Sequence, residues 1–271
     1  MNKIFPMLFV VMILATGCPQ PEPEVHKTEF GLFTPYAFFP EILNGKVKEV
    51  VEKNYIGIEE EGKIIKGERL TVAARDSISW TNDFKVVYDE AGNVLKSILL
   101  DENDENIQKS KSTIEDGRVI KNESIRDDTL NAYTSITYDE AGQVSKIERF
   151  GLPADTLLWS VRLLSDENGN FKEWHWTDWS RSPSGKHIFT VNQEGLRTGF
   201  KFYNKDGEVA LEQAFTYNEM GFLTKQVITT EEEESVSEYE YDYDEKNNWI
   251  KVIATTNGQT IVTERTYTYF E

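Results

Sequence analysis

The stretch Tyr-Asp-Glu-Ala-Gly-Asn-Val-Leu-Lys at residues 88–96 decides the fold, because the chain repeats it. Residues 138–146 read Tyr-Asp-Glu-Ala-Gly-Gln-Val-Ser-Lys, and looser copies begin at Tyr203, Tyr217 and Tyr243. Self-similarity of this kind indicates a repeat architecture in which each copy is one supersecondary unit. We therefore expect the chain to be built from repeated units.

Each copy has the pattern of a β-hairpin. Apolar residues alternate before it, as at Phe84, Val86 and Tyr88, and a period of two with aromatic and β-branched residues predicts a strand. An Asp or Asn then caps the turn through its side chain, and a Gly takes the positive-φ position. The turn residues predicted from the clearest copies are Asp89, Gly92, Asp139, Gly142, Asn218 and Gly221.

The spacing of the turns predicts how the hairpins are joined. Gly92, Gly117 and Gly142 follow one another at intervals of 25 residues, which is enough for two strands and two turns. The predicted fold is all-β, an extended antiparallel β-meander of repeated hairpins with on the order of 16 strands. Open twisted sheets rarely exceed about 10 strands, so the sheet is expected to curl or roll. Only residues 37–43 show a pattern that fits a short helix.

The N-terminus has the features of a secretory signal. Lys3 precedes an apolar run from residue 4 to residue 14, which is too short for a permanent membrane span, and small residues follow. The single cysteine, Cys18, comes directly after them, and this arrangement resembles the lipobox of bacterial lipoproteins. The resemblance implies that residues 1–17 are a signal peptide and that Cys18 is lipidated. The alternative is an ordinary signal peptide followed by a chance cysteine.

The segment after the cysteine predicts a spacer. Residues 19–24 alternate Pro with Gln or Glu, and such alternation favours an extended, semi-rigid chain. We therefore expect a tether over residues 18–40 and one β-hairpin repeat domain over residues 41–271. Glu22 and Glu24 resemble the surface-export signal of lipoproteins from the Bacteroides group, which implies an outer-membrane lipoprotein that could face outward or the periplasm.

Composition excludes one class of partner. The chain has 29 Lys and Arg residues against 47 Asp and Glu residues, and its formal net charge of −18 becomes −19 once residues 1–17, which contain Lys3 and no acidic residue, are removed. Such a charge repels phosphate backbones, so nucleic acid is not an expected partner. The expected partners are the membrane, through Cys18, and an envelope protein or a glycan.

The repeated phrase resembles the RHS or YD repeat of bacterial surface and toxin-delivery proteins. Residues 86–94 and 136–144 match its form well, residues 215–223 less closely, and residues 241–250 replace the Gly. The resemblance implies a spiralling β-sheet. The Arg that usually follows the Gly of that repeat is replaced here by Asn93, Gln143 or Phe222, so the resemblance concerns architecture more than activity.

An aromatic cluster is the strongest candidate for ligand binding. Trp174, Trp176 and Trp179 lie within six residues, and alternation in a strand places Trp174 and Trp176 on one face. An aromatic face can stack on sugar rings or on peptide side chains, whereas the alternative is that these residues fill the core of a sheet. Exposure of the face would favour the ligand site.

No residue pattern indicates a catalytic or metal centre. His26, His175 and His187 are the only histidines, too few and too scattered for a zinc site. His175 near Asp178 lacks a nucleophile motif, and the acidic turn at residues 101–106 lacks the spacing of an EF-hand. The sequence therefore predicts a non-catalytic, lipid-anchored cell-envelope protein without a cofactor or metal, whose repeat β-sheet is a binding or scaffolding surface. The alternative is a carbohydrate- or peptide-capture module that uses the tryptophans.

Overall fold

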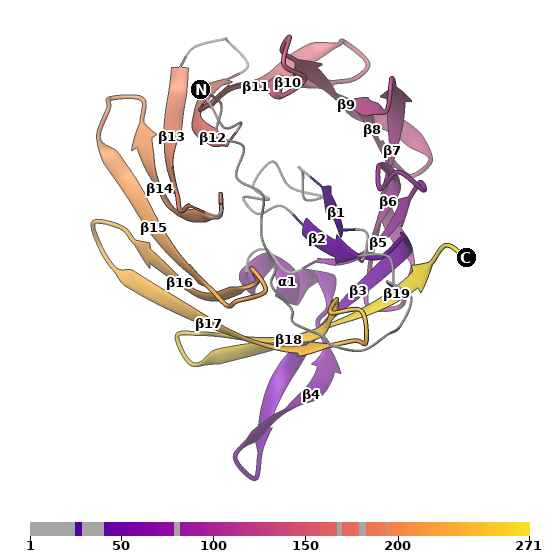
Figure 1. Cartoon of the computed structure of the whole chain (residues 1–271), viewed down its shortest axis with the longest axis vertical. Coiled ribbons are helices and arrows are strands. Elements are labelled where there is room, and N and C mark those ends of the chain that lie inside the picture. The colour runs from indigo at the N-terminus through magenta and orange to yellow at the C-terminus, as the bar shows by residue number, and fades with distance from the viewer. Residues whose placement is uncertain (1–24, 29–40, 79–81, 167–169, 179–182, 194) are drawn as a thin grey trace, which may run out of the picture.

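The computed structural model describes residues 25–28, 41–78, 82–166, 170–178, 183–193 and 195–271. Nearly all of them lie in β-strands (Figure 1). The strands are β1 (Val25–Thr28), β2 (Glu41–Asn44), β3 (Val47–Glu60), β4 (Lys63–Arg69), β5 (Asp83–Tyr88), β6 (Val94–Leu100), β7 (Asn106–Glu115), β8 (Arg118–Arg126), β9 (Thr129–Tyr138), β10 (Val144–Gly151), β11 (Thr156–Ser165), β12 (Phe171–Asp178), β13 (Pro183–Val191), β14 (Arg197–Asn204), β15 (Val209–Tyr217), β16 (Leu223–Thr229), β17 (Glu234–Tyr243), β18 (Trp249–Thr256) and β19 (Gln259–Tyr269).

The strands from β3 onward form a closed antiparallel barrel, and β1 and β2 form a separate two-stranded sheet (Figure 1). Each strand from β5 to β19 pairs with the next, and β3 closes the ring by pairing with β19 on one side and with β5 on the other. Because β3 joins the fifteen strands from β5 to β19, the ring has sixteen strands. Closure leaves no strand of the ring with an unpaired edge.

The prediction of an all-β antiparallel meander is confirmed, but the prediction of an extended sheet is wrong. The sheet closes because the last strand, β19, pairs with β3. Their register runs from Ile261 opposite Ile56 to Tyr269 opposite Val47. The helix considered for residues 37–43 is also wrong where it can be compared, because Glu41–Asn44 form β2, and residues 37–40 lie outside the described part of the chain.

One excursion leaves the ring between β3 and β5. β4 continues beside the far end of β3, and a seven-residue helix, α1 (Val72–Ile78), follows it. The hydroxyl of Thr71 caps α1 by accepting a hydrogen bond from the amide of Ala74 at 3.2 Å. The short sheet of β1 and β2 is drawn within the ring in Figure 1. The N-terminal segment predicted as a tether therefore contains a strand at Val25–Thr28.

Eight of the hairpin turns in the described residues share one geometry. In the turn after β5, Asp89 accepts hydrogen bonds through Oδ1 from the amides of Ala91 and Asn93, and Gly92 has a φ of 82°. The equivalent glycines Gly142 and Gly221 have φ values of 81° and 84°. Turns of this type begin at Asp89, Asp101, Asp139, Asp166, Asn192, Asn204, Asn218 and Asp244. All but those at Asp101 and Asn204 lie at the same end of the barrel, because the strands alternate in direction.

Tyrosines link neighbouring strands at that end. Tyr138, Tyr217, Tyr241 and Tyr267 each donate a hydrogen bond from the hydroxyl to a main-chain carbonyl near the start of the preceding strand, at 2.5 to 2.9 Å. Stacking occurs along a strand, as between Tyr241 and Tyr243 with ring centroids 6.1 Å apart. Of these four residues, Tyr138 and Tyr217 belong to the repeated phrase, and each thus joins its own strand to the preceding one.

Candidate functional site

The two faces of the barrel wall differ in chemistry, and the inner face can be identified from β2. Leu43 of β2, which is drawn within the ring, packs against Val50 of β3 and Val86 of β5 (Figure 1). Because successive side chains of a strand point to opposite faces, these two residues define the inner face. Cross-strand registers then extend that assignment around the barrel, for example from Val86 to its partner Ser97.

The outer face is charged. Ion pairs recur on it between neighbouring strands or between alternate residues of one strand. They include Lys85–Glu49, Lys121–Glu123, Lys146–Glu148, Lys201–Glu212 and Lys251–Asp242, with nitrogen–oxygen distances between 2.6 and 3.6 Å. Side chains of this kind are solvated in water. The outer wall is therefore the surface expected of a sheet that faces water.

The inner face is aromatic along the strands from β11 to β15. Buried and half-buried side chains on it form one cluster, which includes Trp159, Trp174, Trp176, Phe189, Phe200, Phe202, Phe215 and Tyr217. Trp159, Trp176 and Phe202 keep part of their surface exposed, whereas Trp174, Phe189 and Phe200 are buried. We call this cluster the aromatic wall.

Two of the predicted tryptophans lie together in the aromatic wall. Trp174 is 5% exposed, and its ring meets Phe189 edge-on at 4.8 Å between centroids. Trp176 packs against Trp159 at 5.5 Å. The prediction that Trp174 and Trp176 share a face therefore agrees with the registers, but Trp174 serves as core, while Trp176 presents the more accessible ring. Trp179 lies outside the described residues.

His187 is a polar residue that lies among the rings of the aromatic wall. The indole Nε1 of Trp176 donates a hydrogen bond to its Nδ1 at 2.9 Å, so Nδ1 is the unprotonated nitrogen. Rings of Phe200 and Phe202 lie 5.1 and 5.0 Å away. Burial lowers the pKa of His187 from 6.5 to about 4, because the charged imidazolium is poorly solvated there. The side chain is therefore neutral at neutral pH.

Arg197 contributes a buried cation to the same wall. Its guanidinium carbon lies 4.8 Å from the ring centroid of Phe189, 5.2 Å from that of Trp174 and 5.6 Å from that of Phe171. Burial lowers its pKa from 12.5 to about 10. The group remains protonated at neutral pH, and the surrounding ring faces stabilise it by cation–π attraction.

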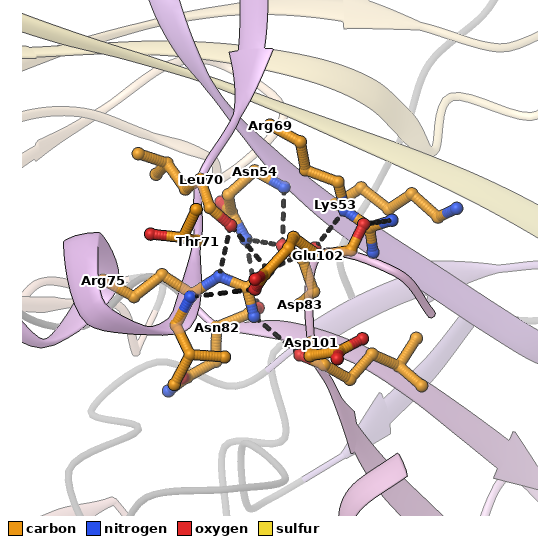
Figure 2. Close-up of polar contacts among 12 residues, drawn as sticks. Lys53, Asn54, Arg69, Leu70, Thr71, Arg75, Asn82, Asp83, Asp101 and Glu102 are labelled. Atoms are coloured by element: carbon orange, nitrogen blue, oxygen red, sulfur yellow. Dashed lines mark hydrogen bonds and ion pairs between the residues drawn. The ribbon is translucent and has the colours of Figure 1, made fainter. Parts of the chain in front are cut away.

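A separate polar network lies where the excursion of β4 and α1 leaves the ring (Figure 2). The side chain of Asp83 is fully buried, and its Oδ2 contacts Arg69 Nε and Arg75 Nη2, both at 2.6 Å. Its Oδ1 accepts hydrogen bonds from the backbone amide and the side-chain amide of Asn54 at 2.8 and 3.1 Å. All these contacts saturate the carboxylate.

The network also ties the excursion to the barrel rim. Arg75, which is 3% exposed, donates to the carbonyl oxygens of Leu70 and Leu100. Arg69 reaches Asp104 at 2.7 Å in the turn between β6 and β7, and this contact, together with one from Lys53, lowers the pKa of Asp104. Because its charges are paired with one another, the network has a structural role: it holds β4 and α1 against the barrel. We call this network the clasp.

The remaining residues considered in the sequence analysis do not join the aromatic wall. His175 lies on the outer face and contacts Glu173 at 2.8 Å rather than Asp178. In the acidic turn at residues 101–106, Asp101 Oδ1 accepts the amides of Asn103 and Glu105, so this carboxylate organises its own loop. Cys18 lies outside the described residues. Within the described ranges, no group of three or more His, Cys, Asp or Glu side chains is arranged to hold a metal ion.

Sequence reasoning missed His187, Arg197 and the clasp around Asp83. His187 lies on β13, at the position opposite Trp174, and the alternation of apolar residues in that strand could have placed it on the inner face. Nothing local distinguishes Asp83 from the other acidic residues. Its partners come from β3, β4 and α1, and the excursion that brings them together was not predicted.

Comparisons with known proteins support the fold. No family model and no curated protein matches the chain, so the resemblance to RHS or YD repeats gains no support from sequence. Among solved structures, a porin-like protein from Bacteroides uniformis is similar over 82% of this chain and 96% of its own, with 9% identity and a TM-score of 0.51. A porin-like protein from Bacteroides vulgatus covers 83% and 100% at 10% identity, with a TM-score of 0.35.

The likeness to the first of these structures concerns the barrel fold. None of the helices in the part of the chain that the structure describes has the length and apolar character needed to cross a membrane. The chain is thus an all-β, sixteen-stranded antiparallel barrel that resembles a Bacteroides porin-like protein in fold.

Proposed function

We propose that the protein is a non-catalytic outer-membrane lipoprotein, anchored through Cys18, whose barrel stands in water and binds an apolar ligand against its aromatic wall. The observation that carries this proposal is the distribution of chemistry across the wall: charged side chains face outward, and aromatic rings face inward. A barrel that spans a membrane has the reverse arrangement, with an apolar outer band.

The outer charges favour an anchor over a membrane-spanning barrel. Lys85, Lys109 and Lys201 lie on the outer face in the middle of their strands. A Lys at the bilayer midplane costs about 2–4 kcal/mol, and three such residues would already oppose insertion strongly. Membrane attachment is therefore assigned to the acyl chains that the resemblance of residues 1–18 to a lipoprotein signal implies.

The aromatic wall favours an apolar ligand. Trp159, Trp176 and Phe202 offer partly exposed rings, and neutral His187 adds no charge at neutral pH. Binding sites for apolar molecules are lined in this way, with few polar groups that fix orientation. A glycan or peptide remains the second candidate, because the accessible Trp176 ring can also stack on a sugar or a side chain.

Ligand binding is tested with the mature chain, residues 18–271, produced without lipidation. Titration with the apolar probe bis-ANS is expected to show saturable binding that Phe202→Ala weakens. The matched control is Tyr203→Ala, which removes the adjacent aromatic residue on the outer face of the same strand. Equal loss in both variants, or no saturable binding by the unmodified chain, contradicts the proposal. Binding on a glycan array that depends on Trp176 would favour the second candidate.

The anchor is tested in cells. Replacing Cys18→Ala is expected to release the protein from the membrane fraction, since no other part of the proposed arrangement holds it there. A Cys18→Ala protein that still sediments with outer membranes, and that high salt does not extract, would show that the barrel itself is inserted.

A further inference from the structure

The inner face of the barrel also has a polar part, on the strands from β6 to β9. The cross-strand registers that place Val86 inward continue through side chains with hydroxyl or amide groups. They are Ser97, Ser110, Ser112, Asn122, Ser124 and Thr134. Several of these groups bond to one another, as where the amide of Asn122 donates to the hydroxyls of Ser110 and Ser112 at 3.4 and 3.3 Å. The barrel interior therefore has an aromatic side and a polar side.

Arg149 lies where the two sides meet. On β10 it pairs with Thr134 of β9 and with Trp159 of β11, and all three side chains point inward because cross-strand partners share a face. Its guanidinium donates hydrogen bonds to the hydroxyls of Thr134 and Ser124 at 3.1 and 3.3 Å. Both acceptors are neutral, so these contacts orient the guanidinium without balancing its charge.

No carboxylate lies beside Arg149 among the described residues. The inward positions that surround it on β9 to β11 are not acidic: Ala132, Ile136, Ile147, Gly151 and Val161. An inward acid, Asp178, lies opposite Trp159, on the side away from the hydroxyls that Arg149 contacts. Arg149 makes no ion pair within the described ranges. Burial lowers its pKa, but an arginine stays charged at neutral pH. The interior therefore holds a positive charge that no nearby acid balances.

The accessible rings of the aromatic wall begin directly beside Arg149. Trp159 is its cross-strand partner, and Trp176 packs against Trp159 at 5.5 Å. His187 accepts the hydrogen bond from Trp176 and pairs with Phe202 on β14. Four strand spacings of about 4.8 Å separate β10 from β14, which is about 19 Å along the wall. A cation thus stands at one end of a row of partly exposed rings that is long enough for an alkyl chain.

We propose that the ligand of the aromatic wall is an anionic amphiphile of the fatty-acid class, with its carboxylate on Arg149 and its alkyl chain against the three accessible rings. This inference rests on the proposed function, because it names the ligand class for the same wall. A guanidinium matches the two oxygens of a carboxylate in a bidentate pair, and the two hydroxyls that Arg149 contacts can donate to the same group. A neutral amphiphile would gain the apolar contacts alone.

Isothermal titration calorimetry of the mature chain with decanoate and with decan-1-ol tests this assignment at neutral pH, because the two ligands share a chain length and differ in charge. The unmodified chain is expected to bind decanoate about ten- to hundredfold more tightly, which is the range for a hydrogen bond to a charged group. Arg149→Gln is expected to remove this preference and to leave the affinity for decan-1-ol unchanged. Arg149→Lys keeps the charge and is expected to retain more of the preference. Phe202→Ala is expected to weaken the binding of both ligands.

The matched control is Arg162→Gln, which removes the same charge from an exposed position on the outer face of β11 and is expected to leave both affinities unchanged. Equal binding of the acid and the alcohol, or a preference that survives in Arg149→Gln, would overturn this inference and leave the aromatic wall as a site for neutral apolar ligands. Loss of both ligands in Arg149→Gln would also overturn it, since removal of the charge must spare the alcohol. Binding of neither ligand by the unmodified chain would overturn the proposed function as well.

Discussion

Acidification is predicted to weaken the barrel through His187. Burial lowers the pKa of this side chain from 6.5 to about 4, so between these values the unfolded chain binds a proton that the folded protein does not. The free energy of unfolding therefore falls as the pH falls through this range. One pKa unit corresponds to about 1.36 kcal/mol. Lowering the pH to about 5 uses about 1.5 units of the difference and costs about 2 kcal/mol.

The assay is urea unfolding followed by tryptophan fluorescence at about pH 7.5 and about pH 5. Other groups also titrate in this range, so the reference is His187→Asn, whose side-chain oxygen can accept the hydrogen bond from Trp176 Nε1 and does not titrate. The unmodified protein is expected to lose about 2 kcal/mol more than the variant between the two pH values. An equal loss in both proteins would refute the assignment of His187 as a buried neutral base.

Three further predictions concern stability, each measured by urea unfolding at neutral pH. Asp83→Asn is expected to cost about 3–5 kcal/mol, because it leaves the buried guanidinium of Arg75 without its carboxylate. Gly221→Ala is expected to cost about 1–2 kcal/mol because of its φ of 84°, and Gly221→Asn is expected to cost less, since Asn247 occupies the equivalent position at a φ of 63°. Phe200→Ala is expected to cost about 3–5 kcal/mol through the cavity left among its aromatic neighbours.

Matched surface variants distinguish these effects from general damage. Asp128→Asn removes a carboxylate that is 90% exposed and is expected to change stability by less than about 0.5 kcal/mol. Tyr203→Ala removes an aromatic residue from the outer face and is expected to cost less than Phe200→Ala. If Asp83→Asn is as mild as Asp128→Asn, the clasp does not hold the excursion in place.

The hairpins could be predicted from sequence because their determinants are local. Asp89 and Gly92 form their turn with residues at most four positions away, so the repeated phrase contains the whole of its own structure. Closure could not be predicted, because it depends on β3 meeting β19, and no residue near either strand signals that pairing. The excursion was missed for a related reason: a helix as short as Val72–Ile78 gives little periodic signal.

The candidate site was predictable in part. Alternation was enough to place Trp174 and Trp176 on one face, but whether that face looks inward depends on the curvature of the closed sheet. His187 and Arg197 acquire their properties from neighbouring strands. The composition shows that the chain is rich in acidic and aromatic residues. It does not show which of them lie on the outer face of the barrel and which on the inner face, because that depends on the strand register.

The seam between β3 and β19 has a consequence for the order of folding. Across it, Arg265 contacts Glu52 at 2.7 Å, and the two residues are 213 positions apart in the chain. Each hairpin can form as soon as its own two strands have been synthesised, whereas this junction needs the last strand and carries the entropic cost of joining distant ends. Until then the two edge strands of the incomplete sheet remain unpaired and can pair with other chains. The eleven residues of β19 therefore determine when the exposed edges, and with them the risk of aggregation, are removed.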